Sequence, residues 1–316
     1  MGGFVSSSAF KRTQRALQAL VGLVVINVVF LVLAPSYRQV ANFTTILSNA
    51  TVLGCLAAGS TIVIISGGLD LSIGSIIALV SVVVGYLLML EVPVYLAILA
   101  GLGTGALCGL ISGFIIVSTG IPSFIGTLGM MMAVRGAAEI IGAGKDMSAF
   151  PGSFSMLGSG YIVPVAIMAA AFILVAIFLS QTRLGFNAFA IGGNAEVARL
   201  SGISVKKNQV LYYLLGGLFA GLAAVIETSR LDFAQSSRGS GQELNSIAAV
   251  IIGGTTMAGG MGGVGRTVIG VLIMTSLSAG LSHLGVGSSW QRIAIGIVII
   301  LAVWIDTFQR HRASKA

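Results

Sequence analysis

Segment 66–72 places polar residues between two long apolar runs. It reads Ser-Gly-Gly-Leu-Asp-Leu-Ser. An ionised Asp at the centre of a membrane-spanning helix costs roughly 2.5–3.5 kcal/mol, so we expect Asp70 at an interface, in a cavity or at a helix start. Asp70 or Ser72 could cap the following helix, whose first backbone N–H groups need an acceptor. The segment could equally form a polar element beside a path through the protein, and one residue could do both.

A second glycine-rich break begins at Gly253 and interrupts the apolar run 244–258. Interrupted spans that recur in the two halves of a membrane protein indicate a transport route. We therefore predict that the residues lining or gating such a route are Gly67, Gly68, Asp70, Ser72, Gly253, Gly254 and Thr255.

Segment 187–205, which lies between two apolar runs, combines a helix start signal with a helix stop signal. Asn194 can cap a short helix, and Gly202 stands where a left-handed residue would end it. Such a helix is either a plain interfacial helix or a docking element for a cytoplasmic partner. The residues concerned are Asn194, Glu196, Val197, Ala198, Arg199, Leu200, Gly202 and Ile203.

Motifs for catalysis are weak or missing in the sequence. No phosphate-binding G-x-x-x-x-G-K-[ST] loop occurs, and Gly260-x-Gly262-x-x-Gly265 lacks the acidic residue that a dinucleotide site needs about 20 positions later. The histidines, His283 and His311, are too few for a metal site or a catalytic triad. We expect no catalysis, no metal and no cofactor in this chain.

Composition defines the elements that must position these residues. Only 8% of the 316 residues are charged, 56% are hydrophobic, and the mean hydropathy is +1.03. A soluble domain is typically about 25% charged, so we predict an all-α polytopic membrane protein that forms one domain over 1–316, with no soluble domain. Some spans are short or glycine-interrupted, and about ten are expected, near 16–34, 44–65, 71–90, 93–119, 122–142, 161–180, 208–228, 244–258, 266–285 and 290–306.

Basic residues indicate the orientation of these spans. Placing both termini in the cytoplasm puts most of the Lys and Arg residues on the inner side. The net charge of +8 then reflects membrane orientation and not nucleic-acid binding. Lys145, Arg230 and Arg238 then fall on the outer side. Arg135 and Glu139 lie one helical turn apart, and either neutralise each other or act at the outer mouth.

Glycines recur every four residues in the span near 93–119, at positions 101, 105, 109 and 113. On a helix they form one smooth stripe against which another helix can pack closely. We predict a structural role for this stripe.

Four sequence blocks resemble the ribose-type sugar permeases of bacterial ATP-binding cassette importers, over nearly the whole chain. In order they are 66–74, 122–129 with Arg135-Gly136, 190–194 with 198–203, and 243–255. Each block is weak alone, but four in the right order are specific. The chain departs from the family pattern at Arg266, where a glycine usually precedes the threonine.

The resemblance implies a ten-helix permease in the bacterial inner membrane, surrounded by lipid. It implies pairing with an identical or paralogous permease, two cytoplasmic ATPase subunits that bind ATP-Mg, and an external sugar-binding protein. Arg230 and Arg238 on the outer side are the candidates for docking that external protein. Segment 187–205 would then couple to the ATPase, and the solute would be a monosaccharide or a sugar-like molecule.

One alternative stays open, a self-contained transporter driven by protons or sodium. Proton relays need chains of carboxylates or histidines inside the membrane. Asp70 and Glu139 are the only credible ones in this sequence.

Overall fold

The apolar runs of the sequence form long helices in the computed structural model, which describes residues 3–142 and 147–313. Each predicted span coincides with a helix. The helices that coincide with the predicted spans are α1 (Gly3–Leu33), α2 (Val40–Ile65), α3 (Ile73–Met89), α4 (Val94–Thr119), α5 (Ser123–Gly142), α7 (Ile162–Gln181), α10 (Val205–Leu231), α11 (Gln242–Ile252), α12 (Val264–His283) and α13 (Ser288–Ala313).

Six of these helices, α2, α4, α5, α7, α10 and α12, are long and apolar enough to cross a membrane. The remaining predicted spans coincide with shorter apolar stretches in α1, α3, α11 and α13. The prediction of a polytopic all-α membrane protein is thus confirmed, whereas the count of ten spans and the side of the termini stay predictions. Lys145, which was assigned to the outer side, lies outside the described residues.

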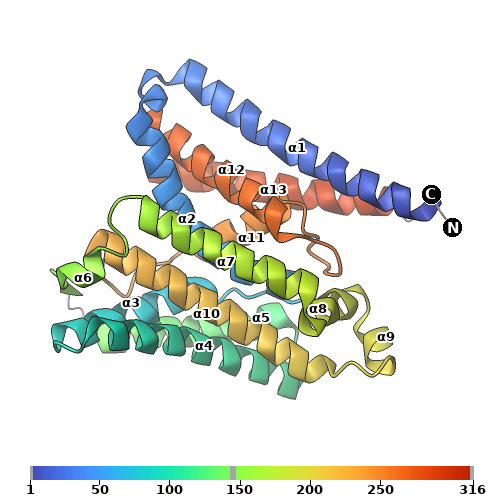
Figure 1. Ribbon diagram of the computed structural model, residues 1–316, viewed down its shortest axis with the longest axis horizontal. Coiled ribbons are helices and arrows are strands. Elements are labelled where there is room, and N and C mark those ends of the chain that lie inside the picture. The colour runs from blue at the N-terminus through green and yellow to red at the C-terminus, as the bar shows by residue number, and fades with distance from the viewer. Residues whose placement is uncertain (1–2, 143–146, 314–316) are drawn as a thin grey trace.

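Short elements join the long helices. They are the 3-10 helix η1 (Pro35–Arg38), the helices α6 (Gly152–Ser155), α8 (Arg183–Gly193) and α9 (Ala195–Leu200), and the strands β1 (Met147–Ser148) and β2 (Phe233–Ala234). The two strands pair antiparallel, with Met147 opposite Ala234. Helices α8 and α9 lie at the same end of the bundle as the beginning of α1 and the end of α13 (Figure 1).

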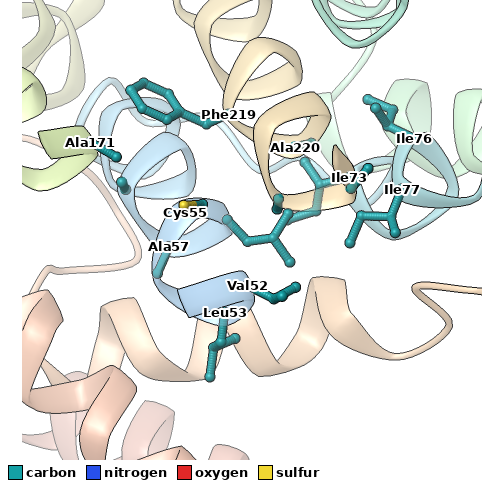
Figure 2. Packing of buried hydrophobic residues seen from close by; sticks show 14 of the residues in the cluster. Val52, Leu53, Cys55, Ala57, Ile73, Ile76, Ile77, Ala171, Phe219 and Ala220 are labelled. Atoms are coloured by element: carbon teal, nitrogen blue, oxygen red, sulfur yellow. The ribbon is translucent and has the colours of Figure 1, made fainter. Parts of the chain in front are cut away.

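Helix α2 forms the centre of the core. It contacts α7, α10, α11 and α12, and 89% of its most apolar 18-residue stretch is buried. Figure 2 shows its side chains among those of α3, α7 and α10, with labels on Val52, Leu53, Cys55, Ala57, Ile73, Ile76, Ile77, Ala171, Phe219 and Ala220. Cys55 and Cys108 are free and buried, as expected for small apolar residues.

The predicted glycine stripe packs α4 against α10. A Cβ atom on Gly109 would overlap the carbonyl oxygen of Tyr213, and one on Gly113 would lie 2.9 Å from the Cα of Val210. Gly105 faces Gly217 in the same way. Because both helices present bare backbone, they approach more closely than side chains would permit. The structural role predicted for the stripe is confirmed.

We expect Gly109→Val to destabilise the α4–α10 pair, because the added atoms have no space. Overpacking of this kind costs about 1–3 kcal/mol, which corresponds to several degrees in the melting temperature of the detergent-solubilised protein. Gly103→Val is the matched control, since a Cβ on Gly103 meets no atom within 4 Å. Equal melting temperatures for the two variants would contradict this explanation of the stripe.

Candidate functional site

The first glycine break forms the buried connection between α2 and α3. Segment 66–72 is non-helical, yet Ser66, Asp70 and Ser72 are 3%, 4% and 0% exposed. Such a chain segment needs hydrogen-bond partners for its backbone groups. The Leu69 N–H donates to Ser123 Oγ at 3.1 Å. The Leu69 carbonyl accepts from the hydroxyl of Tyr213 at 3.3 Å. The break is therefore fastened to α5 and α10.

The Asp70 carboxylate organises the beginning of α3. Its Oδ1 accepts hydrogen bonds from the backbone N–H of Ser72 at 2.9 Å and from the Ser72 hydroxyl at 2.6 Å. Asp70 therefore supplies the acceptor, and Ser72 is a donor to it. The second oxygen, Oδ2, is buried and has no hydrogen-bond partner among the described residues.

The second glycine break joins α11 to α12. We predicted an apolar span over 244–258 with a break inside it, but α11 ends at Ile252 and residues 253–263 form an irregular loop. The helix stops because Gly254 adopts a φ of +84°, which is incompatible with a continuing right-handed helix. Inside the loop, the Gly263 N–H donates to Thr255 Oγ1 at 3.4 Å.

The two breaks lie against each other and against the end of α8. The Gly260 N–H donates to the Ile65 carbonyl at 2.8 Å. A Cβ on Gly259 would lie 2.8 Å from the Cα of Gly67 and 3.0 Å from the Cα of Gly192. The structure therefore brings together Gly67, the loop 253–263 and the segment containing α8 and α9.

Helix α9 has the cap and the stop that the sequence predicted. Asn194 Oδ1 accepts hydrogen bonds from the backbone N–H groups of Glu196 and Val197, both at 3.0 Å. Gly202 has a φ of +85°, and its N–H donates to the Arg199 carbonyl. The Ile203 N–H donates to the Ala198 carbonyl, which completes a Schellman motif. Both structural expectations are confirmed.

The surface of α9 is apolar in its middle and charged beside it. Val197 and Leu200 are 57% and 74% exposed, whereas Ala198 is buried in this chain's own core. Glu196 and Arg199 form an exposed ion pair. The hydrogen bond and then the charge of Arg199 lower the pKa of the Glu196 carboxyl, so Glu196 is ionised at neutral pH.

A cavity of about 400 Å³ separates α9 from the first break. Its walls come from the end of α4, the beginnings of α5 and α10, and one side of α9. Polar groups line it, among them Ser123, Glu196, Lys206 and Gln209, together with the backbone of Gly67 and Gly68.

Comparison with known proteins identifies the family to which this chain is similar. Residues 42–303 match the family described as branched-chain amino acid transport system / permease component. The chain belongs to this permease family. No solved structure matches the permease significantly.

Three curated relatives match the permease over most of its length. Ribose import permease protein RbsC of Escherichia coli K12 is 38% identical over 92% of both chains. RbsC of Bacillus subtilis 168 is 38% identical over 94% of both chains. Galactose/methyl galactoside import permease protein MglC of Escherichia coli K12 is 35% identical over 92% of this chain and 93% of its own. The permease is thus a multi-pass protein of the inner membrane.

Two arginines predicted on the outer side of the permease have partners within it. Arg230 Nη1 donates to the Ser48 carbonyl at 2.8 Å and to Asn49 Oδ1 at 3.0 Å. The Arg238 guanidinium lies 5.4 Å from the centre of the Phe233 ring. Both side chains are half-buried.

Arg135 links α5 to the connection between β2 and α11. Its Nη1 donates to the carbonyl oxygens of Ser236 and Arg238, at 2.6 and 2.8 Å. It forms no direct ion pair with Glu139 within the described residues.

Sequence reasoning missed several residues of this site. Ser123, Thr127 and Tyr213 hold Leu69 in the first break, and Gly192 contacts both breaks. The Pro-Ser-Phe-Ile-Gly-Thr block that contains Ser123 and Thr127 was noted in the sequence, but its hydrogen-bond role was not.

Proposed function

We propose that this chain is the permease subunit of an ATP-driven importer for a monosaccharide or a sugar-like solute. The observation that carries the proposal is the similarity, over at least nine tenths of both chains, to import permeases named for ribose and for galactose. The connections at 66–72 and 253–263 carry buried polar side chains, among them Asp70, Ser72 and Thr255, and they suit a solute path, since irregular backbone at membrane depth is tolerated only inside protein or beside water.

In this proposal the chain crosses the membrane about ten times, with both termini in the cytoplasm. The position of α8 and α9 at the same end as the beginning of α1 and the end of α13 supports a common inner side (Figure 1). The chain acts as a passive pathway subunit, and ATP-Mg is bound and hydrolysed by two partner ATPase subunits. A second permease, identical or paralogous, and an external sugar-binding protein complete the transporter.

Helix α9 is the proposed contact with the ATPase. Val197 and Leu200 form an exposed apolar surface that a partner could bury, and Glu196 and Arg199 lie beside it to set the orientation. Ala198 and the capped ends of α9 hold that surface in place.

The proposed path or gate consists of the two glycine breaks. Asp70 and Ser72 fix the first break at the beginning of α3, and Thr255 holds the second through Gly263. Gly67 and Gly254 adopt φ values of +83° and +84° where these breaks begin, and Gly68 and Gly253 are their neighbours in the proposed path or gate.

The proposed docking residues for the external protein are Arg230 and Arg238. The double variant Arg230→Glu/Arg238→Glu should weaken association of the loaded binding protein by roughly tenfold, because charge pairs at such an interface are lost and replaced by like charges. Arg292→Glu is the control, since Arg292 is exposed and is not one of the proposed docking residues. Unchanged association of the double variant in a binding assay on reconstituted permease would eliminate this assignment.

Uptake in cells with and without the gene tests the proposed function. Ribose, galactose and related sugars are supplied in radiolabelled form, and uptake of at least one should disappear on deletion and on ATP depletion. Uptake that survives ATP depletion but is abolished by a protonophore would instead identify a secondary transporter.

A further inference from the structure

The end of α8 meets both glycine breaks through backbone alone. A Cβ on Gly192 would overlap the carbonyl oxygen of Ile65 and would lie 2.5 Å from the N atom of Gly260. A Cβ on Gly67 would lie 3.5 Å from the Cα of Gly192. Side chains can change rotamer to absorb a displacement, but backbone atoms in direct contact cannot. A shift of α8 is therefore transmitted to its neighbours.

A backbone hydrogen bond also joins the two segments that contact Gly192. The Gly260 N–H donates to the Ile65 carbonyl at 2.8 Å, so the end of α2 and the loop 253–263 are joined directly. Three segments that are distant in sequence thus share one joint, which we define as Ile65–Gly67, Gly192 and Gly259–Gly260.

Helix α9 borders a cavity on the side that carries Ala195, Glu196 and Arg199. The cavity of about 400 Å³ lies between α9, the end of α4 and the beginnings of α5 and α10. Helix α9 therefore has space to move on that side, while the joint at Gly192 has none. The joint at Gly192 is therefore a tightly packed route by which a movement of α9 can reach the two breaks.

We propose that Gly192 is a positioning residue for transport, through which displacement of α8 and α9 moves both glycine breaks as one unit. The proposal rests on the proposed function, since it assigns to α9 the contact with a partner ATPase. It adds that the two breaks respond together, and that the absence of a side chain at position 192 is required for this response.

Gly192→Ala tests the proposal, with Gly193→Ala as the matched control. A Cβ on Gly193 meets no atom within 4 Å, so the control changes composition but not the joint. In reconstituted vesicles Gly192→Ala should lower the solute moved per ATP hydrolysed by roughly tenfold, because the added methyl group separates α8 from the breaks. A purely structural defect would lower transport and hydrolysis in proportion, and that result would overturn the proposal.

A cross-link tests the joint without disturbing Gly192. Gly193→Cys and Met261→Cys place thiols at exposed positions beside the joint, and the native Cys55 and Cys108 are buried and unavailable. If the joint moves as one unit, a short bifunctional thiol reagent should leave solute moved per ATP unchanged. Loss of transport on cross-linking, restored with a cleavable reagent, would show that the joint must open and would overturn the proposal.

If Gly192→Ala fails to assemble, the cross-linking result alone tests whether the joint moves as one unit. Failure of the proposed function is recognised separately, because the unmodified permease would then move no sugar in the same vesicles.

Discussion

Asp70→Leu is expected to abolish solute uptake, whereas Asp70→Asn is expected to assemble normally and to keep a substantial part of it. Leucine removes the acceptor of the Ser72 N–H and of the Ser72 hydroxyl. Ser72 is fully buried, so each unpaired donor costs about 1–3 kcal/mol. The beginning of α3 and the first break should therefore lose their geometry. Asparagine retains Oδ1 as the acceptor for Ser72 and replaces Oδ2 by an amide NH2 of similar size.

Reconstituted vesicles and a melting measurement in detergent separate these effects. We expect Asp70→Leu to melt at a lower temperature than the unmodified permease and Asp70→Asn to melt near it. Should Asp70→Leu assemble and transport like the unmodified permease, Asp70 would have neither of the roles assigned to it.

Gly202→Val and Glu196→Arg are each expected to abolish ATP-dependent uptake while leaving membrane insertion intact. Valine is strained at the φ of +85° that Gly202 adopts, so the end of α9 must rearrange. Arginine at position 196 replaces the ion pair with Arg199 by two like charges beside the exposed Val197 and Leu200. Both changes alter the proposed contact with the ATPase.

Two milder variants serve as controls for this prediction. Gly202→Asn should function, because asparagine tolerates the left-handed region, and Glu196→Gln removes the charge without reversing it. The measurement is co-purification of the ATPase, together with hydrolysis and transport in vesicles. Full transport by Gly202→Val and Glu196→Arg would place the coupling contact on another segment.

The long helices could be predicted because their signal is local and strong. Apolar runs of membrane-spanning length predicted where each long helix lies. Most helix ends agree with the prediction to within a few residues, whereas α1 begins at Gly3 and not near 16. The prediction 208–228 was shorter than α10 (Val205–Leu231), since backbone hydrogen bonding continues past the apolar residues. The cap at Asn194 and the stop at Gly202 were also predictable, because a cap depends on residues only three or four positions away.

Contacts between distant segments could not be predicted in the same way. Arg135 donates to the backbone carbonyls of Ser236 and Arg238. Every residue has a backbone carbonyl, so the residue types at these positions do not indicate the contact. The sequence pattern does not distinguish Gly192 from other glycines, and its contacts with Gly67 and Gly260 are visible only in the fold. Helix α8 was missed, although Thr182 accepts a hydrogen bond from the Gly185 N–H at its beginning, as a helix cap does.

The burial of α2 has a consequence for biogenesis. In the finished protein this helix meets protein along most of its length, so its surroundings there do not require a lipid-compatible surface. During synthesis, however, α2 leaves the ribosome before the helices that later enclose it exist. It must first be stable against lipid, and insertion into a bilayer selects for apolar residues on all sides of a helix. The apolar sequence of α2 therefore suits both the lipid that it meets during insertion and the protein interior that later encloses it.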